Sequence, residues 1–369
     1  MIKEPPKRIL VIGLTERMGG VETFIYNSTI FSDREKYEYD FLVHGTDHCV
    51  FENEILQFYN NERHIYFVEK IKKNPIKWLK DMLTFYQTNG SKYDYIHIQT
   101  GAASEIVYVF PFCFFYGIKV IVHSHNGNGY SPFINAVFRP IVNWVAYEKI
   151  ACSVEAAKWL FGLDIKKVKI LNNGIDTKKF SYNEQSRKKI RREYHILDEL
   201  VIGHIGRFSE QKNHEKIIAI FREIKKRIEN AKLILVGTGE KIDEIKELVK
   251  KIGYEKSIIF AGKQMNTEEY YSAFDVFLMP SLYEGLPIVG IEAQSMGLQC
   301  YFSNTIDKQI LITDRAKIVS LDATDKEWAD IICNNLISLN DREKYPAIVD
   351  QRGYSIRNTI KELENVYEV

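Results

Sequence analysis

Two glutamates, Glu284 and Glu292, lie in a segment of otherwise mostly small, apolar and turn-forming residues, LMPSLYEGLPIVGIEAQSMG. The first stands in a turn with glycine and proline. The second lies eight residues later, in a predicted helix with Pro287 in its first turn. Eight residues rotate a helix of 3.6 residues per turn by about 80°, so both carboxylates can face one side. Carboxylates accept hydrogen bonds from paired hydroxyl groups, so the two suit a ribose and a hexose separated by a pyrophosphate.

Hydrogen-bond donors accompany the two carboxylates. The predicted helix begins near Leu286–Val289, and the free N–H groups of a helix start bind phosphates or sugar hydroxyls. The alternative is that both glutamates are merely solvated. It loses weight because Ile291, Ala293 and Met296 indicate a buried helix, and glutamate is almost never buried without a partner.

Two cations follow the apolar run Val201–Ile205. Arg207 and Lys212 lie in the loop after it, and Asn213 is suited to cap the next helix. Cations beside a helix start, directly after a strand, make a site shaped for a pyrophosphate, although two solvated loop cations are the alternative. After the next apolar run, Gly237 would let a nucleoside pass close to the backbone.

Two further loops could bind a ligand. Gly19 and Gly20 precede a helix near Val21 and would expose N–H groups to an anion, although a plain turn is the alternative and the dinucleotide-binding pattern is absent. His123 and His125 point the same way in an extended chain but make a poor metal site without a third ligand. His125 could orient a sugar hydroxyl or share a proton with a phosphate, or be a hydrogen-bonded structural residue.

Short apolar runs and helical patterns alternate to position these loops. The first series of predicted strands is Arg8–Ile12, Tyr39–Val43, Tyr95–Ile98, Lys119–His123, Lys149–Cys152 and Val168–Leu171, with helices at Ile76–Thr88 and Phe133–Tyr147. The second is Val201–Ile205, Lys232–Val236, Ser257–Phe260, Val276–Met279 and Gln299–Ser303, with helices at His214–Arg227, Lys241–Lys251 and Ile288–Ser295. Such alternation predicts two doubly wound α/β domains, whose ligands bind beyond the carboxyl ends of the strands.

The 369 residues suggest two domains. We place the boundary in the polar segment Asn172–His195, which has no strand pattern, and predict domains over 1–180 and 181–353. The helix of 354–369 has no strand after it and should pack back onto the first domain. A net charge of +1 gives no reason to expect nucleic-acid binding. Five scattered cysteines and no signal-peptide pattern indicate a cytoplasmic protein.

Together these loops resemble glycosyltransferase family 4, retaining enzymes of the GT-B fold, in which two Rossmann-like domains face a central cleft. The matching pieces occur in the family's order: Gly19–Gly20–Val21–Glu22, His125, Asn173–Gly174–Ile175–Asp176, Gly206–Arg207 with Lys212–Asn213, and Glu284–Gly285–Leu286–Pro287 with Glu292–Ala293. They look most like bacterial exopolysaccharide and capsule glycosyltransferases. Gln294 and Ser295 depart from the family's pattern, which we interpret as a packing variation.

The resemblance implies a role for each matching residue. Arg207 and Lys212 would bind the donor diphosphate, Glu292 the ribose and Glu284 the transferred sugar, with His125 near the anomeric centre. The residues implied as catalytic are His125, Glu284, Arg207 and Lys212. The other donor-binding residues would be Gly19, Gly20, Gly237, Gly285, Leu286, Pro287, Ile288 and Glu292. The acceptor side would comprise Glu22, His123, Asn126 and Asn173.

The implied reaction is metal-independent hexosyl transfer from a nucleotide sugar, with UDP as the expected nucleotide and GDP as the alternative. No cofactor and no metal are expected, because Arg and Lys replace the cation and the chain has no Asp-x-Asp. A 2-epimerase of the same architecture and a non-catalytic nucleotide-sugar-binding protein are the rival interpretations.

A membrane partner is also expected. Glu69–Tyr86 combines five lysines with Trp78, Phe85 and Tyr86, and Lys178–Arg192 carries seven basic residues. Basic and aromatic residues on one helix suit docking on an anionic membrane. The acceptor would then be a saccharide, for example one linked to undecaprenyl diphosphate, and the protein would lie on the inner face of the cell membrane.

Overall fold

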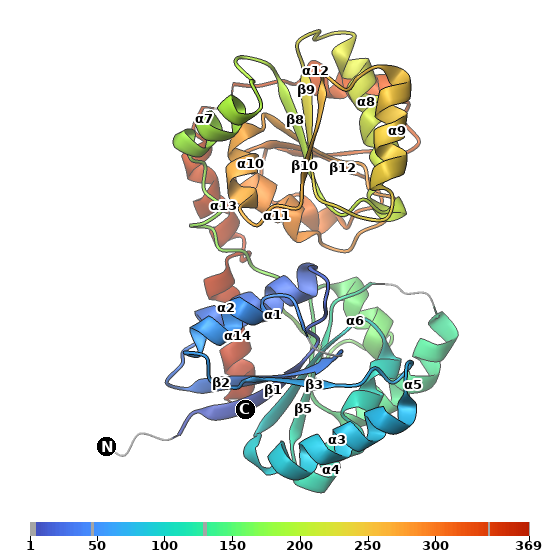
Figure 1. Cartoon of the computed structure of the whole chain (residues 1–369), viewed down its shortest axis with the longest axis vertical. Coiled ribbons are helices and arrows are strands. Elements are labelled where there is room, and N and C mark those ends of the chain that lie inside the picture. The colour runs from blue at the N-terminus through green and yellow to red at the C-terminus, as the bar shows by residue number, and fades with distance from the viewer. Residues whose placement is uncertain (1–4, 46–47, 128–130, 339, 369) are drawn as a thin grey trace. The chain divides into compact units, whose positions relative to one another are not determined.

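The computed structural model describes residues 5–45, 48–127, 131–338 and 340–368. It divides into two compact units, Met1–Gly174 with Ile356–Val369, and Ile175–Ser355. Each unit is a parallel sheet covered by helices, so the predicted pair of Rossmann-like domains is confirmed (Figure 1).

The sheet of the first unit has seven strands in the order β3-β2-β1-β4-β5-β6-β7. The strands are β1 (Lys7–Ile12), β2 (Tyr37–His44), β3 (Ile65–Val68), β4 (Tyr95–Thr100), β5 (Lys119–Ser124), β6 (Ala146–Ala151) and β7 (Lys169–Ile170). All six pairings are parallel. Their carboxyl ends therefore share one edge, where the predicted ligand loops of this unit begin.

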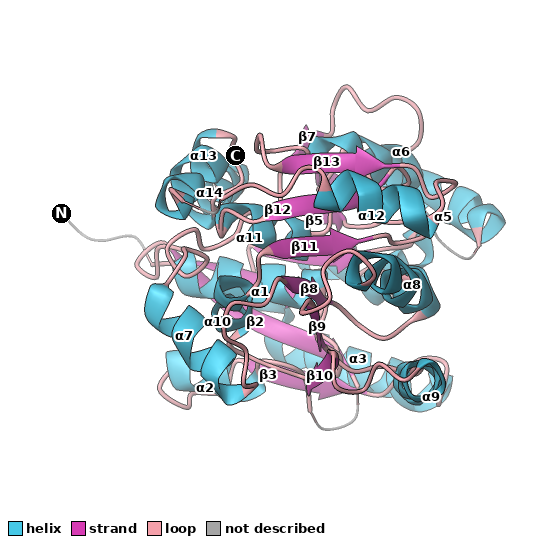
Figure 2. Cartoon of the chain, turned by 90° about the horizontal axis from the view of Figure 1, so that it is seen from above, coloured by secondary structure: helices cyan, strands magenta, loops and turns pink. Residues whose placement is uncertain are grey.

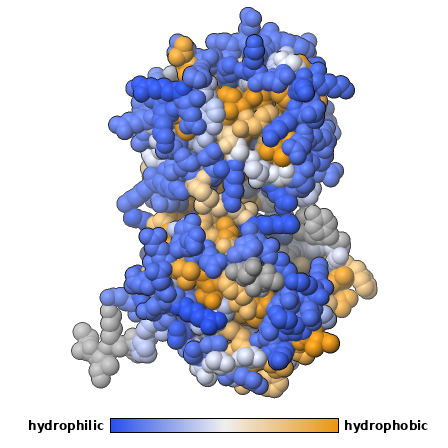
Figure 3. Space-filling view, in the orientation of Figure 1, coloured by the Kyte–Doolittle hydropathy of each residue, from blue (hydrophilic) through white to orange (hydrophobic). Residues whose placement is uncertain are grey.

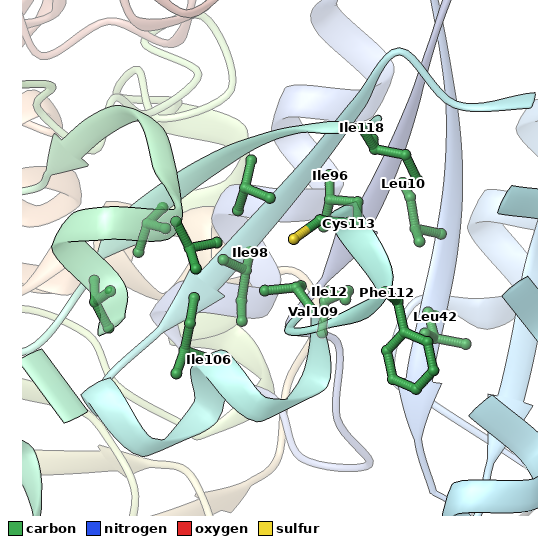
Figure 4. Packing of buried hydrophobic residues seen from close by; sticks show 14 of the residues in the cluster. Leu10, Ile12, Leu42, Ile96, Ile98, Ile106, Val109, Phe112, Cys113 and Ile118 are labelled. Atoms are coloured by element: carbon green, nitrogen blue, oxygen red, sulfur yellow. The ribbon is translucent and has the colours of Figure 1, made fainter. Parts of the chain in front are cut away.

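Two layers of helices cover this sheet. One core, part of which is drawn in Figure 4, joins the sheet to α3 (Pro75–Asn89), α4 (Phe112–Tyr116), α5 (Pro132–Val145) and α6 (Val154–Phe161). The other joins it to α1 (Gly20–Phe31), α2 (Glu52–Phe58) and α14 (Ile356–Tyr367). Short 3₁₀ turns, η1 (Gly90–Lys92) and η2 (Ala103–Tyr108), lie beside β4 in the chain.

The last helix, α14, packs into the first unit as predicted. Its buried residues are Ile356, Thr359, Ile360, Leu363, Val366 and Tyr367. The Tyr367 hydroxyl lies 2.7 Å from Nδ1 of His97 in β4, and the Tyr95 hydroxyl donates to the Tyr367 carbonyl at 3.0 Å. This helix is therefore an integral part of the first unit's core.

The sheet of the second unit has six strands in the order β10-β9-β8-β11-β12-β13 (Figure 2). The strands are β8 (Val201–Ile205), β9 (Lys232–Val236), β10 (Ile258–Gly262), β11 (Val276–Met279), β12 (Gln299–Ser303) and β13 (Ala316–Val319). The helices are α7 (Glu184–Glu193), α8 (His214–Lys225), α9 (Ile242–Ile252), α10 (Thr267–Ala273), α11 (Ile288–Ser295), α12 (Asp325–Cys333) and α13 (Tyr345–Gln351). The 3₁₀ turns are η3 (Glu210–Lys212), η4 (Lys308–Ile310) and η5 (Arg342–Lys344).

The polar segment that we took as the domain boundary contains a helix, α7. Asn183 caps it by accepting from the Ser186 N–H, and Arg187 and Arg191 each lie 2.7 Å from a carboxylate oxygen of Asp275. The absence of a strand pattern between 172 and 195 agrees with the structure, but no helix was predicted there, because α7 is mainly charged and finds its partners only in the tertiary structure. The division between the units falls inside this segment, between Gly174 and Ile175, and so lies before the predicted domain limit at residue 180.

Candidate active-site residues

The loops after β8 and β11 meet through an ion pair. Nζ of Lys212 lies 2.6 Å from Oε1 of Glu284, and the two side chains are only 15% and 11% exposed. Two charges that have lost this much water must compensate one another, because an unpaired buried charge is costly. The structure therefore brings together two residues that the sequence placed separately, one beside the diphosphate and one beside the transferred sugar.

Backbone and amide hydrogen bonds hold the two loops in register around this pair. The Leu282 N–H donates to the Gln211 carbonyl at 2.8 Å, and Nε2 of Gln211 donates to the Tyr283 carbonyl at 2.9 Å. Nδ2 of Asn213 donates to the Pro280 carbonyl at 3.1 Å. These contacts fix the backbone on both sides of the ion pair.

Asn213 does not cap the following helix with its side chain, so that prediction is wrong. It occupies the N-cap position of α8 in a left-handed conformation, with φ 56° and ψ 50°, and makes no side-chain capping bond. Asparagine tolerates this conformation better than most residues. Its amide instead joins the loop after β8 to the loop after β11.

Arg207 has a different partner from Lys212. Its guanidinium lies 2.9 Å from Oε2 of Glu240, and both side chains are more than half exposed. An exposed pair of this kind contributes little to stability, about 0–1 kcal/mol. The Arg207 fork is therefore available to exchange Glu240 for an incoming phosphate at small cost.

Gly237 permits close packing between two loops. Its φ is +138°, and a Cβ there would lie 2.0 Å from the Gly206 carbonyl oxygen. The backbone of this loop thus fits against the loop that carries Arg207. At Gly285, by contrast, a Cβ would meet no described atom within 4 Å, so the backbone beside Glu284 is open to a ligand.

Glu292 lies in a separate, almost dry environment. It is 8% exposed, and Oε2 accepts a hydrogen bond of 2.9 Å from the Tyr271 hydroxyl of α10. Burial raises the pKa of Glu292 to about 7, although the Tyr271 hydroxyl and the charge of Lys179 oppose the shift. The same hydroxyl lies 3.0 Å from the Val289 carbonyl, and its one hydrogen serves either acceptor but not both.

The geometric argument that relates the two glutamates is wrong. Helix α11 begins at Ile288, and Pro287 is its N-cap residue rather than part of its first turn. Glu284 lies before the helix, so the helical rotation of about 80° does not describe the two carboxylates. Leu286 and Pro287 are buried, while Ile288 is partly exposed at the helix start.

In the first unit, the start of α1 already holds an anion. Gly19 is the N-cap residue, and the Glu22 carboxylate turns back over the first turn, where it accepts from the Thr15 hydroxyl at 2.7 Å and from its own N–H. Burial raises the pKa of Glu22. A diphosphate that approached Gly19 and Gly20 would have to displace this carboxylate.

His123 is completely buried, so the prediction that it contacts the acceptor substrate is wrong. Neither ring nitrogen has a hydrogen-bond partner among the residues described. Its ring packs edge-on against Phe24 of α1, 5.0 Å between centroids. As a residue of a central strand, it points into the layer between sheet and helix.

His125 is partly exposed and has one clear partner. Nε2 lies 2.6 Å from Oε1 of Gln99, and burial lowers the pKa of His125 to about 3. The imidazole is therefore neutral at neutral pH, and when Nε2 donates to Gln99, Nδ1 is left as an acceptor. Nδ1 has no partner within the described part of the chain.

The remaining acceptor-side residues lie in loops of the first unit. Asn126 is exposed, and Asn173 is 7% exposed with an Oδ1 that no described residue contacts by a hydrogen bond. The segment predicted around His125 continues into residues 128–130, which lie outside the described residues. Tyr271, Gln211 and Gln99 escaped prediction because no local pattern relates them to their distant partners.

Comparison with known proteins shows the family to which the chain belongs. The model of glycosyltransferase family 4 matches residues 18–179, and that of glycosyl transferases group 1 matches residues 186–315. A putative glycosyltransferase of Bacillus subtilis, EpsF, is 29% identical over 98% of this chain and 97% of its own. An Escherichia coli UDP-Gal:α-D-GlcNAc-diphosphoundecaprenol α-1,3-galactosyltransferase is 23% identical over 82% and 83%.

Solved structures share the fold. Anabaena Alr3699/HepE in complex with UDP and glucose has a TM-score of 0.81 at 17% identity and covers 98% of this chain and 99% of its own. Its complex with UDP-glucose gives a TM-score of 0.80 at 18% identity, covering 98% and 100%. With both family models matched in chain order and a relative similar over almost its whole length, this chain belongs to the group 1 and family 4 glycosyltransferases of the GT-B fold.

Proposed function

We propose that this glycosyltransferase moves a hexose from a UDP-sugar to a saccharide acceptor, with retention of anomeric configuration, in the synthesis of a cell-surface polysaccharide. The observation that carries the proposal is the Lys212–Glu284 ion pair, held at the carboxyl ends of β8 and β11. Its cation suits a departing diphosphate and its carboxylate suits sugar hydroxyls. The names of the E. coli relative and of the HepE complexes support a UDP-linked donor.

The ion pair would open when the donor binds. Lys212 would turn to the diphosphate, together with Arg207 after its release from Glu240, and Glu284 would then be free to accept from hydroxyls of the transferred sugar. Glu292 would hold the ribose hydroxyls in its drier environment. His125, neutral and with a free acceptor, would contact the transferred sugar near its anomeric carbon. In each of these roles, the side-chain atom that would bind the donor either has a hydrogen-bond or ion-pair partner that the donor could displace or has no such partner among the described residues.

Charge builds on the β-phosphate of the leaving group as the glycosidic bond breaks. Preorganised cations and helix N–H groups stabilise such a charge, and loss of one donor commonly costs about 3–4 kcal/mol by analogy with oxyanion holes. We propose attack by the acceptor hydroxyl on the face that the nucleotide leaves. The departing phosphate would take the acceptor's proton.

No metal is needed for this scheme, because Lys212 and Arg207 supply the positive charge. One described cluster, Glu38, Asp40 and His64, has ligand atoms close enough together for a metal ion. However, Asp40 accepts from the Tyr93 hydroxyl at 2.7 Å, and the Arg8 guanidinium lies 2.6 Å from Glu38. We assign that cluster to structure, and we expect EDTA to leave transfer unchanged.

We propose a lipid-linked saccharide as the acceptor, on the inner face of the cell membrane. The printed name of the E. coli relative, which acts on a diphosphoundecaprenol-linked sugar, supports this choice. Among the residues described, no helix combines the length and apolar character that a bilayer crossing requires. The prediction that the aromatic residues of α3 contact a membrane is wrong, because Trp78, Phe85 and Tyr86 are buried in the core.

The decisive experiment is a panel of UDP- and GDP-sugars, read by nucleotide release and by binding. We expect one UDP-sugar to bind and to release UDP faster when a saccharide acceptor is added. A 2-epimerase would instead convert the sugar without acceptor, and a non-catalytic binder would retain the donor unchanged. Absence of binding across the panel would contradict all three functions.

A further inference from the structure

The outward face of α5 carries no polar side chain. Its exposed positions hold only proline, phenylalanine, isoleucine, alanine, valine and tryptophan. Phe133 is 80% exposed and Trp144, near the other end of the helix, is 68% exposed. A helix on the surface of a soluble protein normally turns its polar side to water, so this face is made for an apolar or interfacial environment.

The neighbouring helix α4 extends this surface. Phe114 and Phe115 are exposed, the latter by 76%, and the Phe114 ring stacks on Trp144 with 4.9 Å between centroids. Figure 3 shows hydrophobic residues gathered at the margin of the first unit, where Figure 1 places α5. The exposed apolar side chains of α4 and α5 therefore meet at Phe114 and Trp144, and together they are hereafter called the α4–α5 surface.

Charge around this surface is one-sided. The 106–147 stretch contains no aspartate or glutamate, and its charged residues are Lys119 and Arg139. Helix α3 adjoins α4, since Tyr86 stacks on Phe112 at 4.6 Å. The 69–86 segment, which includes α3, adds five lysines against two carboxylates. Lys70, Lys73 and Lys77 already lie within 4.0 Å of a carboxylate of Glu16, Glu69 or Asp81. The two segments together still carry more positive than negative charges, and this excess attracts an anionic partner.

We propose that the α4–α5 surface docks on an anionic lipid bilayer, with its aromatic side chains at the level of the headgroups and the α3 lysines beside them. The proposal deepens, and rests on, the proposed transfer to a lipid-linked acceptor. A bilayer fits better than another protein, because protein interfaces form about one hydrogen bond per 100–200 Å². The exposed positions of α5 offer a single side-chain hydrogen-bonding group, the indole N–H of Trp144, and tryptophan is suited to the headgroup level of a bilayer.

Trp144 makes the proposal directly measurable. Trp78 and Trp328 are buried and Trp159 is mostly covered, so Trp144 is the exposed tryptophan of the chain. Full-length protein is mixed with vesicles of phosphatidylglycerol, of phosphatidylcholine, or of either lipid brominated in its acyl chains. Flotation measures binding, and bromine quenching reports which tryptophan enters the bilayer.

Variants locate the contact. We expect F115S/F133S to lower affinity for anionic vesicles at least about ten-fold, and W144F to remove the quenching. The matched control is L197S, which alters a residue of the second unit that is 82% exposed, and it should bind like the parent. Phosphatidylcholine should bind more weakly than phosphatidylglycerol because it lacks the charge.

Three results would overturn the proposal. The first is that the protein binds no vesicle of any composition, and the second is that F115S/F133S binds vesicles as tightly as the parent. The third is that, without lipid, the parent is a dimer and F115S/F133S is a monomer, because the surface would then join two copies of the chain. UDP binding is measured on the same proteins and should be equal in all of them. A chain that floats with vesicles but binds no nucleotide sugar would refute the proposed function and leave the docking surface intact.

Discussion

Lys212 and Glu284 are 72 residues apart in the chain, yet Nζ of the lysine lies 2.6 Å from Oε1 of the glutamate. Each side chain compensates the charge of the other, and this attraction offsets the free-energy cost of removing both charges from water. On the proposed function, a bound donor would replace this one strong contact by two new ones, a phosphate for the lysine and hydroxyl groups for the glutamate.

Lys212→Met should damage both stability and transfer. Removal of the cation leaves the Glu284 carboxylate poorly hydrated and unpaired, which we expect to lower the free energy of unfolding by on the order of 3 kcal/mol. Urea denaturation and the rate of sugar transfer are the measurements. The double variant Lys212→Met/Glu284→Gln should recover most of the stability but not the transfer. A double variant as unstable as the single one would show that the pair is not what stabilises these loops.

The two glutamates should separate nucleotide binding from transfer. Glu292→Ala should weaken the binding of free UDP, since its carboxylate is assigned to the ribose. Glu284→Ala should spare free UDP and slow transfer, because its carboxylate is assigned to the sugar that free UDP lacks. Calorimetric titration with UDP and initial rates with the UDP-sugar distinguish these effects. Equal loss of UDP affinity in both variants would contradict the division of roles.

Glu292 should make stability depend on pH. Its pKa in the folded protein is about 7, raised from 4.5 by burial, so the folded state binds this proton more tightly than the unfolded chain does. The resulting stabilisation is complete below about pH 4.5 and is lost as the pH rises through about 7, on the order of 3 kcal/mol in total. Unfolding measured from pH 5 to 8 should show this loss in the parent and not in Glu292→Gln.

Tyr271→Phe should shift the pH dependence of nucleotide binding. The Tyr271 hydroxyl donates to Glu292 and favours the ionised carboxylate, which is also the form that accepts from ribose hydroxyls. Without that hydroxyl the pKa of Glu292 should rise further, and UDP affinity should reach its plateau at a higher pH. A variant that only loosened the packing would lower affinity equally at every pH.

Gly237→Ala should be far more damaging than Gly285→Ala. A Cβ at Gly237 would overlap the Gly206 carbonyl oxygen and would require a φ of +138°, whereas a Cβ at Gly285 meets no described atom within 4 Å. Strain and overlap together should cost at least about 2 kcal/mol at Gly237. Thermal unfolding of both variants is the test, and equal melting temperatures would refute the close approach of the two loops.

Much of the fold followed from alternating apolar runs. Every predicted strand is present, with ends displaced by up to three residues. The strands that escaped prediction, β3 and β13, are four-residue edge strands, whose pattern is too short to stand out. The predicted helix Phe133–Tyr147 ran two residues too far, because β6 begins at Ala146 directly after α5.

Side-chain environments were harder to predict than elements. Trp78, Met82 and Phe85 recur at the spacing of a buried helical stripe. The lysines between them nevertheless led to the prediction that this helix docks on a membrane. On α5, Phe133 and Trp144 are of residue types common in cores, yet they are exposed, and no pattern in the sequence indicated this. The Lys212–Glu284 and Tyr271–Glu292 contacts depend on loops that only the folded sheet brings together, so local spacing could not reveal them.

The place of α14 has a consequence for how the chain matures during its synthesis. The helix is translated after residues 175–355, yet it belongs to the core of the unit that is translated first. Residues 175–355 can emerge from the ribosome and fold as a unit while the earlier unit still lacks Ile360, Leu363 and Tyr367. Folding in order from the N-terminus is the usual expectation. Here the second unit is free to finish first, and the nascent first unit stays open along β1 and β4 until α14 has been synthesised and has left the ribosome.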